Sequence, residues 1–159
     1  PVRITTTAEI APNCFGVFHC GEALIQLLTP DAMEEIREID SLFAPISNDA
    51  FFDSVVVHEL AHALYDGTDC PYQNCLATSE YLAYSYQIMS FSDVDRAALE
   101  AGIDMDRTIS RDYVVGILAV MSPDTFTRRV WQHFSQRGDQ CSWLGGILSG
   151  AIVFDHDYP

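Results

Sequence analysis

The chain has 159 residues, 48% of them hydrophobic, which is enough for one domain with a buried core. Acidic residues outnumber basic ones by 23 to 8, and the resulting net charge of −15 argues against binding to nucleic acid or to an anionic membrane surface. No apolar run reaches the ~18 residues that a membrane span needs, so we expect one globular domain over residues 1–159.

The N-terminal third predicts a small sheet followed by a helix. Residues 1–13 are polar, contain two prolines and predict a strand or an extended arm. Residues 14–30 hold two β-rich runs broken at Gly21, which indicates a hairpin or a pair of edge strands. Thr29 and Pro30 are typical of a helix start, and apolar residues at helical spacing extend the predicted helix to Pro45.

The remainder of the chain predicts helices. Asp53 is the expected cap of a helix that runs to about Asp66 and ends at Gly67, and a loop over 67–75 follows. Further helices are expected over 77–91 and 92–102, and over 110–138 as two helices hinged at Ser122 and Pro123. Residues 141–155 are too rich in glycine to assign. The predicted class is α+β, mostly helical with a small N-terminal sheet.

The cysteines bear on the compartment. The chain has five, and Cys14 with Cys20 and Cys70 with Cys75 form two closely spaced pairs, leaving Cys141. The sequence does not fix the pairing, but disulfides within these segments would predict an oxidising compartment. A structural zinc site is the alternative, although no C-x-x-C pair exists. On the cysteines we expect a secreted or periplasmic protein. The sequence begins without methionine, which indicates removed residues but does not say whether they were a leader.

The stretch "VVVHELAHAL" (55–64) has metal-ligand spacing. His58 and His62 lie one helical turn apart, so both imidazoles can face one zinc ion (Zn2+). Glu59 lies about 100° further round the helix, where it can reach a water on the metal. The alternative is a core helix whose histidines bond to backbone carbonyls, but that helix would bury the Glu59 carboxylate without compensation.

This stretch resembles the active-site helix of the zincin metallopeptidases, and the resemblance covers about residues 50–90. The metzincin pattern is absent, because Tyr65 and Thr68 stand where it requires Gly and His. The gluzincin pattern takes its third ligand from a downstream helix, and Glu80 lies 18 positions after His62. The chain lacks the exopeptidase motif of zinc aminopeptidases and the N-E-x-x-S-D motif of thermolysins. The resemblance implies a zincin-like domain in which the sheet packs on the metal-binding helix.

Other residues are candidates around this site. Asp69 is the alternative third ligand, because "GTDCPY" loosely resembles a segment of the aspzincins. Asp66 could orient an imidazole, and either His133 or Tyr113 could stabilise the oxyanion, as a Tyr or His does in the similar families. In the C-terminal "FDHDYP", neighbouring side chains would point in alternate directions if the segment is extended, so we assign it no metal site.

The functional hypothesis is a zinc metallopeptidase with Glu59 as general base and a peptide or protein as substrate. Because larger zincins use a second domain as one wall of the cleft, a protein partner could complete the cleft here. The alternative is a catalytically silent zinc-binding module used for protein binding or assembly.

Overall fold

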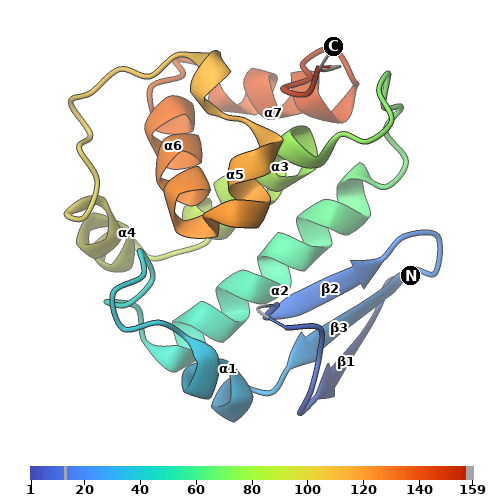
Figure 1. The fold of residues 1–159 in the computed structure, drawn as a ribbon, viewed down its shortest axis with the longest axis vertical. Helices are drawn as coiled ribbons and strands as arrows, with labels where there is room; N and C mark the ends of the chain where they lie inside the picture. The colour runs from blue at the N-terminus through green and yellow to red at the C-terminus, as the bar shows by residue number, and fades with distance from the viewer. Residues whose placement is uncertain (13, 157–159) are drawn as a thin grey trace.

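Helix α2 (Asn48–Tyr65) runs through the middle of the molecule and separates the sheet from most of the other helices (Figure 1). This computed structural model describes residues 1–12 and 14–156. Within them lie three strands and seven α-helices, so the predicted α+β class, mostly helical with a small N-terminal sheet, is confirmed. No helix in this part of the chain is long and apolar enough to cross a membrane.

The sheet consists of β1 (Arg3–Thr7), β2 (Gly16–His19) and β3 (Leu24–Leu28) in the order β1-β3-β2. The central strand β3 is parallel to β1 and antiparallel to β2, with Gly16 opposite Leu27. Gly21 has a φ of 75° in the turn between β2 and β3, which confirms the predicted hairpin. Strands β2 and β3 pack on α2, as expected.

Helix α1 (Pro30–Ile36) begins as predicted, with the Thr29 side chain accepting a hydrogen bond from the Ala32 N–H. The predicted extension to Pro45 is wrong, because Arg37 is extended and ends the helix. The Arg37 guanidinium donates to the Ile46 carbonyl and to Asn48, which folds the chain back toward α2. Ile39, one of the apolar residues whose spacing predicted the longer helix, is 95% exposed.

Helix α2 starts earlier than predicted. Its cap is Ser47, whose hydroxyl accepts from the Ala50 N–H, whereas Asp53 is an exposed residue inside the helix. Phe51 and Val55 are buried, so the apolar face that holds the helix on the core begins before Asp53. The predicted end is confirmed, with Asp66 as the last half-helical residue.

The helices expected after the 67–75 loop are present as α3 (Leu76–Met89), α4 (Asp93–Glu100), α5 (Gly116–Met121) and α6 (Pro123–Ser135). The helix expected from residue 110 starts only at Gly116, after a 3-10 turn at Arg111–Tyr113. Residues 141–155, which the sequence left unassigned, contribute most of a further helix, α7 (Gln140–Leu148). The hinge at Ser122 and Pro123 is confirmed. Helix α7 forms despite its glycines, and Gly146 within it lets Ile152 pack closely: a Cβ there would lie 2.6 Å from Ile152 Cδ1.

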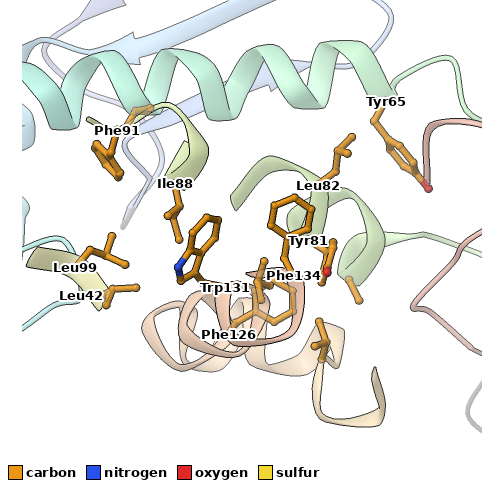
Figure 2. Packing of buried hydrophobic residues seen from close by; sticks show 14 of the residues in the cluster. Leu42, Tyr65, Tyr81, Leu82, Ile88, Phe91, Leu99, Phe126, Trp131 and Phe134 are labelled. Atoms are coloured by element: carbon orange, nitrogen blue, oxygen red, sulfur yellow. The ribbon is translucent and has the colours of Figure 1, made fainter. Parts of the chain in front are cut away.

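The core lies mainly between α2, α3 and α6. Figure 2 shows Tyr81, Leu82 and Ile88 of α3 near the α6 side chains Phe126, Trp131 and Phe134, all at most 4% exposed. Burying a large apolar side chain is worth about 1.5–3 kcal/mol, so this layer fixes α3 firmly in place.

Of the two closely spaced cysteine pairs, Cys70 and Cys75 form a disulfide in the loop before α3. Cys14 and Cys20 are free, as is Cys141, so the expectation of a disulfide in the first segment is wrong. The strand β2 lies between Cys14 and Cys20, and an extended chain of ~3.3 Å per residue holds them beyond the ~7 Å that a disulfide tolerates between Cα atoms.

Candidate metal centre

Three ligand-type side chains converge where α2 packs against α3. His58 and His62 come from successive turns of α2, and Glu80 comes from the second turn of α3. The two Nε2 atoms lie 3.1 Å apart, and the Glu80 carboxylate oxygens lie 3.5 Å from His58 Nε2 and 3.4 Å from His62 Nε2. Within residues 1–12 and 14–156, His58, His62 and Glu80 are the one group of at least three ligand-type side chains placed closely enough to hold a metal ion.

The spacing of these atoms fits a tetrahedral ion. Two ligands bound to zinc at ~2.0–2.1 Å in tetrahedral geometry lie about 3.3–3.4 Å from each other. The observed distances are close to that value: 3.1 Å between the two Nε2 atoms, 3.5 Å from His58 Nε2 to Glu80 Oε2 and 3.4 Å from His62 Nε2 to Glu80 Oε1. Three such ligands occupy one face of a tetrahedron, so the fourth position stays free for water or substrate, as catalytic zinc sites require.

A buried chain of hydrogen bonds orients His58. Its Nδ1 donates to Gln87 Oε1 at 3.0 Å, and Gln87 Nε2 donates to the Ser54 hydroxyl at 3.1 Å. The Ser54 hydroxyl donates in turn to the Phe51 carbonyl at 2.7 Å, which leaves it as the acceptor for Gln87. Gln87 thereby keeps a proton on Nδ1 of His58 and leaves Nε2 as the nitrogen that faces Glu80 and His62.

The cluster is buried on one side and accessible on the other. The Tyr84 ring meets the His58 ring edge to face, with centroids 4.6 Å apart. The side chain of His58 is 11% exposed, whereas those of His62 and Glu80 are 18% and 20% exposed. Solvent therefore reaches the cluster from the side of His62 and Glu80.

The charges within the cluster stabilise one another. Burial alone would raise the pKa of Glu80, but hydrogen bonds and charge from His58 and His62 hold this pKa far below its usual value. Burial would lower the pKa of His58, yet Glu80, Glu59 and the bond to Gln87 outweigh it and raise the pKa. Glu80 is thus an anionic carboxylate facing two imidazoles, which is the donor set of a His2Glu zinc site.

Glu59 lies beside the cluster and under the edge strand β2. It is 5% exposed, and burial raises the pKa of its carboxyl while the nearby His58 and His62 lower it. The backbone of Phe18 in β2 also lowers the pKa of this carboxyl group. Gly16 makes room for this side chain, because a Cβ at Gly16 would lie 2.7 Å from Glu59 Cγ and 2.8 Å from Glu59 Oε1.

The structure brings together four of the sequence candidates, namely His58, Glu59, His62 and Glu80. The alternative ligand Asp69 lies in the loop after α2, and its carboxylate is not part of the cluster. The Asp66 carboxylate accepts a hydrogen bond from the Gly21 N–H at 3.2 Å, which ties the end of α2 to the β2–β3 turn.

The two candidates for oxyanion stabilisation have other contacts. His133 on α6 is 2% exposed, and its Nδ1 lies 2.8 Å from the Tyr81 hydroxyl. Burial, together with the charges of Arg137 and Arg111, lowers the pKa of His133 to about 4. Tyr113 is half exposed, with Arg129 over its ring.

Sequence reasoning missed the residues that support the cluster. Gln87 and Tyr84 lie seven and four residues after Glu80, so one face of α3 carries all three, and this periodicity was visible in the sequence. Gly16 could not be linked to Glu59 from the sequence, because the register of β2 against α2 is a tertiary feature. Cys14 lies on this side too, and burial followed by the charges of Glu59 and Glu80 raises the pKa of its thiol.

Comparison with known proteins gives a family and no described function. No curated protein and no solved structure matches the sequence. A family model does match, described as "Family of unknown function (DUF6639)", and it covers residues 1–157. With nearly its whole length matched, the chain belongs to this family.

Proposed function

We propose that the protein is a zinc metallopeptidase of the gluzincin type, in which His58, His62 and Glu80 hold zinc. The observation that carries this proposal is the convergence of three ligand side chains: the two Nε2 atoms lie 3.1 Å apart, and each lies 3.4 or 3.5 Å from one of the two Glu80 carboxylate oxygens. The hydrogen bond from His58 Nδ1 to Gln87 supports it, because it directs the other ring nitrogen into the cluster.

The chemistry follows from the side chains around the cluster. A zinc ion with three protein ligands supplies Lewis acidity, which acidifies water near neutral pH and polarises a carbonyl group. Glu59 is the general base: its carboxylate takes a proton from the water that attacks the peptide carbonyl. The same carboxylate then returns that proton to the nitrogen of the departing amine. The close approach of Gly16 in β2 keeps Glu59 in place for both transfers.

The expected substrate is a peptide or protein, and the net charge of −15 favours basic segments. The Cys70–Cys75 disulfide supports a secreted or periplasmic location. Nucleic acid is not expected as a partner.

One observation favours the alternative, a catalytically silent zinc-binding module. Two cavities of the structure lie between the 72–76 segment, residues 111–120 and residues 153–156, and neither is lined by the three cluster residues. We infer that a peptidase with this site would draw part of its cleft from a partner protein.

Glu59→Gln tests the enzymatic hypothesis. It preserves the shape of the side chain and removes the base, so cleavage of a mixed peptide library should fall by at least about a hundredfold while zinc content stays the same. Glu35→Gln, an exposed change on α1, is the matched control and should cleave like the wild type. If wild type and Glu59→Gln both bind zinc and neither cleaves peptides, the silent module is correct.

Chelation distinguishes either zinc protein from a plain helical domain. A bound metal stabilises the folded protein, and this stability is lost when the metal is removed. At a free zinc concentration a thousandfold above Kd, the loss is about 4 kcal/mol. At this size the melting temperature should fall by roughly 10 °C when EDTA is added. A melting temperature that does not respond to EDTA or to added zinc would contradict both zinc hypotheses.

A further inference from the structure

Helix α3 begins without a cap from its own sequence. Its N-cap residue, Cys75, makes no side-chain capping bond, and the first turn contains no acidic residue. The first N–H groups of a helix lack partners within the helix, so an uncapped start tends to fray. This start is one turn away from the proposed ligand Glu80.

The C-terminal segment supplies the missing cap. The Asp155 carboxylate accepts hydrogen bonds from the Ala77 N–H at 2.8 Å and the Thr78 N–H at 3.0 Å, and from the Thr78 hydroxyl at 2.6 Å. The Thr78 hydroxyl accepts in turn from the Phe154 N–H at 2.8 Å. A carboxylate at this position also interacts favourably with the helix dipole.

Phe154 fastens the same segment to the next turn of the helix. Its ring stacks on Tyr81 with centroids 4.1 Å apart and 23° between the planes, and it is 5% exposed. Tyr81 is fully buried and follows Glu80 directly in the chain. The residue pair 154–155 therefore holds α3 both before and after Glu80, from a position 75 residues downstream.

We propose that Phe154 and Asp155 form a C-terminal clasp that positions Glu80 for metal binding, with Asp155 as a positioning residue. This inference rests on the proposed zinc site. Ligand sites bind well only when their side chains are held within about 0.5 Å of the required geometry. The His58 and His62 side chains are fixed by α2, so the register of α3 decides whether Glu80 meets them.

The test compares Asp155→Ala with Asp139→Ala. Asp139 caps α7 by accepting from the Ser142 N–H at 2.9 Å, so its loss removes an equivalent carboxylate cap from a helix without cluster residues. The zinc dissociation constant should rise by about tenfold or more in Asp155→Ala, as for other changes next to ligands, and stay unchanged in Asp139→Ala. Asp155→Asn, which keeps one acceptor oxygen, should restore part of the affinity.

Hydrogen exchange gives a second reading. Amides of residues 77–84 should exchange faster in Asp155→Ala and at the wild-type rate in Asp139→Ala. If Asp155→Ala does not fold, Thr78→Val replaces it in the test. This variant removes the hydroxyl that bonds to both Asp155 and Phe154, and it should also weaken zinc binding. Wild-type zinc affinity in Asp155→Ala or in Thr78→Val overturns the clasp alone. A wild-type chain that binds no zinc contradicts the proposed function, and the clasp proposal falls with it.

Discussion

At the scale of single residues, the proposed metal site depends on how His58 is held. A buried imidazole can present either nitrogen, and only one choice suits a metal shared with His62 and Glu80. Gln87 makes that choice because its amide group already donates to Ser54, which leaves its carbonyl oxygen to accept the His58 proton. Gln87 is 3% exposed, so no water replaces it easily.

Gln87→Leu tests this role. Leucine fills a similar volume but leaves the Nδ1–H of His58 without an acceptor, so zinc affinity should fall by about 10–100-fold. Gln132→Leu is the matched control, because Gln132 is also buried and donates to the Asp104 carbonyl away from the cluster. Both variants should lose stability in chemical denaturation, and equal zinc affinity in the two would contradict the role of Gln87.

At the scale of elements, α2 connects two partners of different kinds. One side faces α3 and completes the ligand set, and the other faces β2, where Glu59 lies against Gly16. The sheet is small, but its edge strand β2 determines where the proposed base is held. The hairpin turn is also tied to the end of α2 through the bond between Gly21 and Asp66.

Gly16→Ala should disturb this contact. The new Cβ would lie 2.7 Å from both Glu59 Cγ and Leu27 Cδ2, so Glu59 or the strand must move. Overpacking of this kind costs about 1–3 kcal/mol, and peptide cleavage should fall further than stability alone explains. Gly67→Ala, at a position with nothing within 4 Å of the added Cβ, is the control. Full activity in Gly16→Ala would show that the position of Glu59 does not depend on β2.

The sequence was sufficient where local spacing decides the outcome. Two such local features were predicted correctly: the helical turn that separates His58 from His62 in α2, and the start of α1 at Thr29. The start of α2 was misplaced because Ser47 and Asp53 are equally good caps, and only packing of Phe51 into the core distinguishes them. The clasp at Asp155 could not be predicted, since its partners lie 77 residues or more away in sequence.

At the scale of the whole molecule, the cluster is fastened to the core through α3. Tyr81 binds His133 of α6 through its hydroxyl and stacks on Phe154, so three distant segments meet one residue after Glu80. Burial and two neighbouring arginines keep His133 neutral by lowering its pKa to about 4, from 6.5 for an unperturbed histidine. Protonation of His133 is therefore unfavourable in the folded state.

The folded protein should become less stable as the pH falls, because of this histidine. The unfolded chain binds a proton at His133 below pH 6.5 and the folded chain does so only near pH 4, so its contribution is complete above pH 6.5 and is lost as the pH falls toward 4. Chemical denaturation of the wild type and of His133→Gln at several pH values measures the difference. The variant should be less stable near pH 7, and the gap should narrow below pH 6. A gap that stays constant would mean that His133 titrates normally in the folded protein.

The most direct test of the central claim is an anomalous-scattering map at the zinc edge, from crystals grown without chelator. The account predicts one peak within ~2.0–2.1 Å of His58 Nε2, His62 Nε2 and a Glu80 carboxylate oxygen, with a water in the fourth position. The absence of a peak after the crystals are soaked in zinc, with the imidazoles still hydrogen-bonded to each other and to Glu80, would contradict the proposed zinc site.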